Sequence, residues 1–170
     1  MAGSDQPFYW DTCLFIAWLK DEKRKTPGEM DGVREYIERL KRREIKIITS
    51  TLTITETTET KVGAGVLNIF DNLMKRRNLT RVAVDMRVAQ LARDLRDYYS
   101  QRPDEFNKKT LSVPDAIHLA TAVLYRAQEF NTFDRADRSG TLGLLPLNGD
   151  VAGHRLTICK PSAHQPGLDL

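Results

Sequence analysis

Short apolar stretches of strand length alternate with longer stretches of helical periodicity along the whole 170-residue chain. The longer stretches repeat apolar residues every three or four positions, which places them on one face of a helix. Strands separated by helices usually pair in parallel, because each helix returns the chain to the same edge of the sheet. The order predicts an α/β fold, a three-layer α/β/α sandwich with a mostly parallel central sheet. The expected strands are residues 8–11, 45–48, 79–84, 130–133 and 156–159, and the expected helices are 12–20, 30–44, 66–74, 86–99 and 113–127.

Length and composition fit one domain. The 41% hydrophobic content can form a core without disulfides or a structural metal. Cys13 and Cys159 lie far apart and belong to no CxxC motif, so neither a disulfide framework nor a zinc site is expected. The chain has no signal-like start and no 18-residue apolar run. We therefore expect one domain over residues 1–160, a flexible tail over 161–170, a cytoplasmic location and no membrane contact.

Charge is distributed unevenly along the chain. The net charge is only +3, but residues 75–109 hold ten Lys or Arg against five Asp or Glu, a local +5. Such a field can draw a polyanion to one face. The candidate phosphate contacts are Lys75, Arg76, Arg77 and Arg81, although a solvated helix end would have the same composition.

Four acidic residues follow expected strands or open the helix between them. In open parallel sheets, ligands gather beyond the carboxyl ends of the strands. Carboxylates brought together there would repel one another unless some are protonated or a cation lies between them. Oxygen ligands favour Mg²⁺ or Mn²⁺ over zinc, and such ions can assist phosphodiester cleavage. These candidate catalytic and metal-binding residues are Asp11, Glu56, Asp115 and Asp134.

Two of these acids have a structural alternative. Asp11 precedes an apolar helix and could simply cap it. Ser112 is a suitable helix cap for the segment that places Asp115 in the first turn. His118 lies one helical turn after Asp115 and is either a general base or an oriented structural histidine.

The other two acids also have ordinary explanations. Glu56 lies in a threonine-rich run with Glu59 close behind it, so the pair could form a solvated face. Asp134 could be a turn residue, and Asp137 competes with it for the fourth acidic position.

Taken together, four segments resemble the motifs of PIN-domain ribonucleases. The resemblance covers roughly residues 8–160, and the chain is similar in size to the VapC-type toxins of bacterial toxin–antitoxin pairs. The matching segments are Tyr9-Trp10-Asp11-Thr12, Thr49-Ser50 with Glu56, Pro114-Asp115-Ala116-Ile117-His118-Leu119-Ala120-Thr121-Ala122, and Asn131-Thr132-Phe133-Asp134-Arg135.

The resemblance implies endonucleolytic cleavage of RNA that depends on Mg²⁺ or Mn²⁺. It also implies inhibition by a small antitoxin protein and assembly as a homodimer. Asp11 and Asp115 would be the central metal ligands, and Glu56 a ligand or a base acting through water. Asp134 would complete the acidic pocket, and Thr132 would orient either Asp134 or a metal-bound water. The unusually threonine-rich second motif departs from the family pattern.

Two other functions compete with this interpretation. A catalytically silent PIN scaffold could bind RNA or a protein partner without cleavage, although all four acidic positions are filled here. A magnesium-dependent phosphatase of the haloacid dehalogenase type would need a DxD sequence after the first strand. Asp11-Thr12-Cys13 lacks the second acid.

Overall fold

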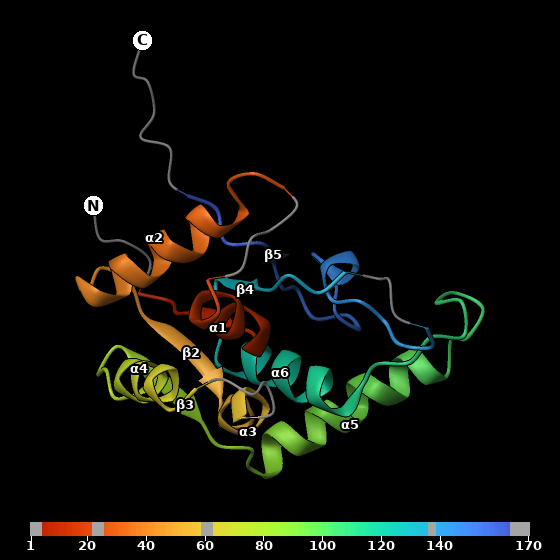
Figure 1. Cartoon of the computed structure of the whole chain (residues 1–170). Helices are drawn as coiled ribbons and strands as arrows, with labels where there is room; N and C mark the ends of the chain where they lie inside the picture. Colours follow the sequence, from red (N-terminus) through yellow and green to blue (C-terminus); the bar gives the residue numbers. More distant parts are fainter. Residues whose placement is uncertain (1–4, 22–25, 59–62, 136–138, 164–170) are drawn as a thin grey trace.

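The computed structural model describes residues 5–21, 26–58, 63–135 and 139–163. Within these ranges five strands form one all-parallel sheet in the order β3-β2-β1-β4-β5 (Figure 1). The central strand β1 pairs with β2 on one side and with β4 on the other. The strands are β1 (Phe8–Trp10), β2 (Ile47–Ser50), β3 (Leu79–Val82), β4 (Glu129–Asn131) and β5 (Ile158–Cys159).

Helices cover both faces of the sheet, so the predicted three-layer fold is confirmed (Figure 1). One core lies beneath α1 (Thr12–Leu19), α2 (Glu29–Lys41) and α4 (Ala64–Met74). The other lies beneath α5 (Met86–Ser100) and α6 (Val113–Leu124), which pack against each other. The alternation of side chains along β1 supplies both cores, because Phe8 and Trp10 enter the first and Tyr9 enters the second.

The region after β2 contains a helix that the periodicity did not predict. Helix α3 (Leu52–Thr58) packs against α1, and its buried side chains are Thr53 and Thr57. Their hydroxyls are satisfied, since Thr53 contacts the Thr49 hydroxyl at 2.7 Å and Thr57 donates to the Thr53 carbonyl at 2.6 Å. Polar residues therefore form the inner face of this helix, where a hydrophobicity pattern shows no signal. β2 also begins two residues later than expected.

The C-terminal segment remains packed as far as Pro161. A Cβ added to Gly32 of α2 would lie 1.9 Å from the Pro161 carbonyl oxygen, so only glycine fits at this contact. Pro161 is buried, and residues 164–170 of the expected tail lie outside the described residues. In the described part of the chain, no helix has the length and apolar character needed to cross a bilayer.

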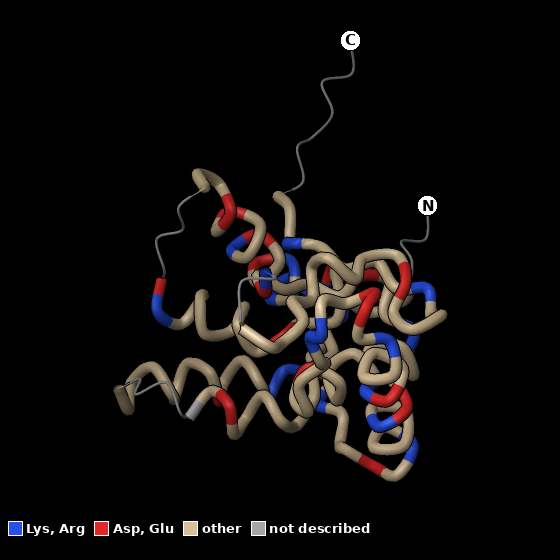
Figure 2. Tube along the Cα trace, turned by 90° about the vertical axis from the view of Figure 1, so that its right-hand side faces the viewer, with Lys and Arg blue, Asp and Glu red and all other residues tan. Residues whose placement is uncertain are grey.

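Basic and acidic residues alternate over much of the chain rather than occupying separate halves (Figure 2). On α2, for example, Lys41 pairs with Glu38 at 2.7 Å. The sheet edges are therefore more informative than the whole-chain charge. We call the side of the sheet where the parallel strands end the carboxyl edge, and the side where they begin the amino edge.

Candidate active site

The four predicted acids all lie at or next to the carboxyl edge. Asp11 directly follows β1 and caps α1, and Asp134 follows β4. Glu56 belongs to α3, which begins after β2, and Asp115 lies in the first turn of α6. Parallel pairing of β1 with both β2 and β4 brings these segments side by side. The topology thus places in one region four residues that span more than 120 positions of sequence.

Asp11 both caps a helix and takes part in the cluster. One carboxylate oxygen, Oδ1, accepts the Thr12 backbone N–H at 2.7 Å. The other, Oδ2, accepts the Thr132 hydroxyl at 2.8 Å and the Cys13 thiol at 3.3 Å. The residue is only 7% exposed. These bonds fix the orientation of the carboxylate before any ligand arrives.

Thr132 connects two of the acids. Besides donating to Asp11, its hydroxyl oxygen accepts the backbone N–H of Asp134 at 3.0 Å. The Asp134 carboxylate in turn accepts the Leu144 N–H at 3.2 Å. The competing residue Asp137 lies outside the described residues.

Asp115 is held by the cap of its own helix. The Ser112 oxygen accepts the Asp115 N–H at 3.2 Å, as the sequence predicted, and its hydroxyl donates to Asp115 Oδ2 at 2.5 Å. The pKa of Asp115 is raised to about 6, chiefly by burial and in part by the charges of Asp11 and Asp134, while the hydrogen bond from Ser112 opposes the rise. The three aspartates therefore act on one another electrostatically.

Glu56 points inward rather than forming a solvated face. Its Oε2 accepts a hydrogen bond from the Thr12 hydroxyl and lies 2.8 Å from Nε2 of His118. Burial alone would raise the pKa of Glu56, but the contacts with His118 outweigh it and lower that pKa. Glu56 is therefore ionised at neutral pH.

A buried tyrosine–histidine pair supports Glu56. The Tyr9 hydroxyl lies 2.6 Å from Nδ1 of His118 and accepts the Ser50 N–H at 3.1 Å. Tyr9 and His118 are 0% and 1% exposed. Burial lowers the pKa of His118, but Glu56 and Asp11 outweigh this and raise it overall. Sequence reasoning missed Tyr9. The available signal was the tyrosine hydroxyl itself, because in a buried central strand this group must find a hydrogen-bond partner.

Cys13 also contacts the cluster. Its sulfur lies 3.4 Å from the Thr132 hydroxyl and accepts the Phe133 N–H at 3.3 Å. Burial raises the pKa of the thiol well above its ordinary value, and the charge of Asp11 adds to the rise. Cys13 therefore stays protonated and acts as a weak hydrogen-bond donor.

The donor chemistry of the cluster suits a hard divalent cation. No three His, Cys, Asp or Glu side chains among the described residues form a ready-made metal group. The oxygens are nevertheless of the right kind, being carboxylates with a threonine hydroxyl beside them. The bonds to described residues use Oε2 of Glu56 and Oδ2 of Asp115, which leaves one oxygen of each available. The pKa of Asp115 is raised mainly by burial, and the nearby charges of Asp11 and Asp134, which a cation would offset, add to the rise.

Three of the four predicted phosphate contacts lie at the opposite edge of the sheet from the acids. Lys75 caps the end of α4, and Arg76 and Arg77 follow it before β3, at the amino edge. Arg81 is exposed on the edge strand β3. A four-residue strand such as β3 separates the two edges by about 13 Å. Lys75, Arg76 and Arg77 therefore lie too far from the acids to share one small ligand with them, whereas Arg81 lies opposite Thr49, near the carboxyl end of β3.

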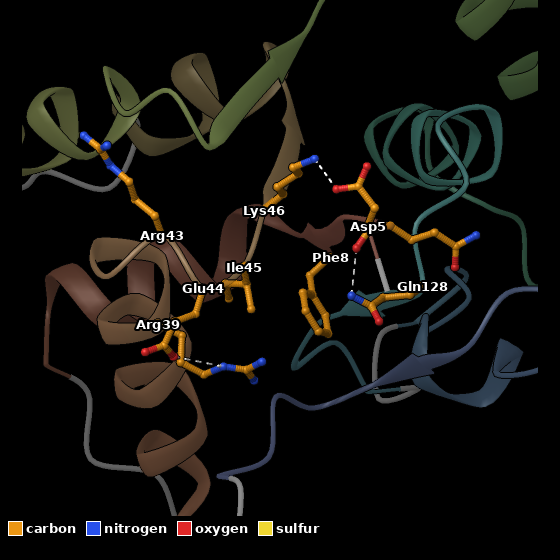
Figure 3. A pocket seen from close by; sticks show the side chains of 9 residues that line it. Asp5, Phe8, Arg39, Arg43, Glu44, Ile45, Lys46 and Gln128 are labelled. Carbon is orange, nitrogen blue, oxygen red and sulfur yellow. Dashed lines mark hydrogen bonds and ion pairs between the residues drawn. The ribbon is translucent and has the colours of Figure 1, made fainter. Parts of the chain in front are cut away.

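The amino edge also has a hollow, lined by other cations. One hollow of about 320 Å³ lies where β1, β2 and β4 begin (Figure 3). Arg39 packs near the Phe8 ring there, with its guanidinium carbon 6.0 Å from the ring centroid. Lys46 pairs with Asp5 on the same side of the strands (Figure 3).

Comparisons with known proteins agree with this geometry. A family model described as the PIN domain matches residues 8–137, which include all four acids. A chain in the crystal structure of FitAcB from Neisseria gonorrhoeae is similar in structure, with a TM-score of 0.50 and 16% sequence identity. The similarity covers 75% of this chain and 87% of that one, and at this identity it concerns the fold. A search of curated proteins gives no match.

Proposed function

The chain belongs to the PIN-domain family, whose members are generally nucleases, and from this we propose that it is a metal-dependent endoribonuclease. One observation carries the proposal. Asp115 has a pKa raised to about 6, in part by the charges of Asp11 and Asp134, at the edge of a parallel sheet where ligands bind. A carboxylate cluster of this kind is costly unless it has a cation to bind.

The proposed metal ligands are Asp11, Asp115 and Asp134. When bound, Mg²⁺ or Mn²⁺ supplies Lewis-acid stabilisation of the phosphate and lowers the pKa of a nearby water. Thr132 keeps the Asp11 carboxylate in place by donating to its Oδ2 at 2.8 Å. Ser112 does the same for Asp115.

Glu56 is the proposed base. His118 and Thr12 hold its Oε2, so the other oxygen, Oε1, can take a proton from the attacking water. Attack on phosphorus with departure of the 3′-oxygen leaves a 5′-phosphate and a 3′-hydroxyl. In this scheme His118 is a positioning residue, because it acts through Glu56.

A small antitoxin protein is the proposed partner, by resemblance to VapC-type toxins, and the proposed assembly is a homodimer. A hollow of about 220 Å³ beside α4 supports a protein contact. Trp18, Ile69 and Leu73 give it apolar walls, with Lys41 and Arg76 at its rim, and Ile69 is 52% exposed. An amphipathic peptide segment with acidic residues would fit this hollow.

A thermal-shift titration with Mn²⁺ against EDTA tests the proposal. A ligand at 100 times its Kd adds about 2.7 kcal/mol to the folded state, or roughly 5–10 °C for a chain of this size. We expect that shift and RNA cleavage in the wild type and neither in Asp115→Asn. Asp94→Asn is the matched control, since Asp94 is 60% exposed on α5.

The alternative is a silent scaffold that binds RNA without cutting it. RNA binding with no Mn²⁺ shift and no cleavage would favour that alternative. Cleavage by Asp115→Asn at the wild-type rate, in a preparation free of contaminating nuclease, would show that the assigned acids are wrong.

A further inference from the structure

A second hollow at the amino edge has features that the proposed cleavage site does not use. It has a volume of about 470 Å³ and lies where β1, β2 and β3 begin, beside the end of α6. Its side chains come from residues far apart in the sequence. The lining residues that matter are Pro7, Arg43, Lys46, Ile48, Arg77 and Tyr125.

The described charged residues that line this groove are all positive. They are Arg43, Lys46 and Arg77, and none of the described lining residues is Asp or Glu. Among the described carboxylates, none lies within ion-pair distance of Arg43 or Arg77. Lys46 pairs with Asp5, whose side chain is 90% exposed, so this pair is weak and can exchange for another anion. Two arginines that face one hollow, with no counter-ion from the described part of the chain, favour an anionic ligand.

The walls between these cations are apolar and aromatic. Ile48 forms part of the floor and is 5% exposed, while Tyr125 at the end of α6 is 38% exposed. An accessible tyrosine ring provides a surface on which a nucleobase can stack. The chemistry therefore matches a ligand with a phosphate at one end and a planar ring at the other.

The turn that carries Arg43 is fixed in place. The side-chain amide of Asn78 donates to the Leu40 carbonyl at 2.7 Å and to the Ile45 carbonyl at 2.9 Å. Arg43 itself has a positive φ of 63° within this turn. The bonds of Asn78 tie the start of β3 to the turn before β2, so Arg43 and Arg77 are held near each other before a ligand binds.

We propose that this groove binds one nucleotide of a single-stranded RNA, with its phosphate at Arg43, Lys46 and Arg77 and its base against Tyr125. The proposal rests on the proposed ribonuclease function for the identity of the ligand. Because the groove lies about 13 Å or more from the acids, along strands of about four residues, it holds a different nucleotide from the one cleaved. It therefore selects substrates long enough to reach both places.

The test measures RNA binding with cleavage removed. Asp115→Asn in EDTA is titrated with a fluorescent single-stranded RNA of twelve nucleotides, and anisotropy is read at several salt concentrations. Arg43→Gln and Arg77→Gln should each reduce the salt slope by about 0.7. Tyr125→Leu should weaken binding roughly tenfold without changing the slope. Arg34→Gln and Arg87→Gln are controls, because both arginines are exposed and paired elsewhere.

Titrations with a mononucleotide and with inorganic phosphate show whether the groove recognises a nucleotide or only its phosphate. A mononucleotide should bind far more weakly than the RNA, and with the same dependence on Arg43. Inorganic phosphate that binds as well as the mononucleotide would show that the base contributes nothing and would overturn the role of Tyr125. Circular dichroism of each variant, compared with its parent, identifies a loss of binding caused by unfolding. If Arg43→Gln proves to be unfolded, Arg43→Lys replaces it in the test. This variant keeps the positive charge on an exposed side chain, so it should retain most of the salt dependence of RNA binding.

The outcomes distinguish this proposal from the proposed function. If the wild type cleaves RNA but the groove variants bind it with unchanged affinity and slope, the groove proposal is wrong and the function stands. If the groove variants lose binding while the wild type cleaves nothing, the groove is right and the function is wrong. If no RNA binds at all, the groove proposal is overturned.

Discussion

The hydroxyl of Tyr9 should control how well the acidic cluster binds a cation, although Tyr9 is not itself a proposed ligand. It contacts Nδ1 of His118 at 2.6 Å, and Nε2 of the same ring lies 2.8 Å from Glu56. Nε2 carries a hydrogen both in the imidazolium and in the neutral tautomer that accepts at Nδ1, so the bond to Glu56 exists in both forms. Tyr9→Phe removes the hydroxyl and keeps the ring.

The expected loss of stability in Tyr9→Phe follows from the polar groups that the substitution leaves without hydrogen-bond partners. The Ser50 N–H, 3.1 Å from the hydroxyl, and Nδ1 of His118 would both be buried and unpaired in Tyr9→Phe. Each such group costs about 1–3 kcal/mol. A loss of about 3 kcal/mol in the free energy of unfolding lowers the Tm by roughly 6–12 °C in a chain of this size. Nε2 of His118 also lies 3.8 Å from Oδ1 of Asp11, a proposed metal ligand. Loss of a group that supports a metal ligand typically costs about 10- to 100-fold in metal affinity.

The assay combines thermal unfolding with calorimetric titration of Mn²⁺. Tyr36→Phe is the matched control, because Tyr36 is also buried and donates to Glu129 at 3.2 Å in the opposite core. Both variants should lose stability, but only Tyr9→Phe should weaken Mn²⁺ binding. His118→Gln should retain more Mn²⁺ affinity than His118→Ala, since its amide can still donate to Glu56. Equal Mn²⁺ affinities for wild type, Tyr9→Phe and His118→Ala would refute the reasoning.

Three other perturbations have expected outcomes. The pKa of Asp115 is about 6 in the fold, above its ordinary value of 3.8, so its contribution to stability is present below about pH 4 and is lost as the pH rises through 6. In denaturant titrations without metal, the free energy of unfolding of the wild type should therefore fall between about pH 4 and 6 relative to that of Asp115→Asn. The same pH dependence in both proteins would contradict this. Gly32→Ala should destabilise by about 1–3 kcal/mol in thermal unfolding, because its Cβ would lie 1.9 Å from the Pro161 carbonyl oxygen. Gly65→Ala, with no atom within 4 Å of its Cβ, should not destabilise. Thr132→Val should cost about 1–2 kcal/mol and weaken Mn²⁺ binding, because it removes a hydroxyl that donates at 2.8 Å to a proposed ligand; unchanged Mn²⁺ affinity by calorimetry would argue against that role.

The layers of the fold could be predicted from the sequence because they depend on local patterns. Alternating strands and helices predict a parallel sheet, and residues that come after its strands, such as Asp11 and Asp134, are then expected at the carboxyl edge. The capping of α6 by Ser112 could also be predicted, because it depends on Ser112 and Asp115, which are three positions apart.

The rest of the site depends on contacts that no local pattern encodes. Helix α3 went undetected because its inner face is formed by Thr53 and Thr57 instead of apolar residues. Tyr9 and His118 are 109 positions apart, and their contact exists only because β1 and α6 pack together. The direction in which Glu56 points depends on both of these features.

The position of β1 at the centre of the sheet also affects how the protein is made. Tyr9 pairs with Ile48 on one side and with Phe130 on the other, 121 positions later. At about 5–20 residues per second, the ribosome delivers the second partner roughly 6–24 s after the first strand is synthesised. Until then one edge of β1 has no neighbour, and Asp134 has not reached the cluster. The nascent chain therefore has an exposed strand edge to protect, and it gains the complete acidic site only after Asp134 has been synthesised.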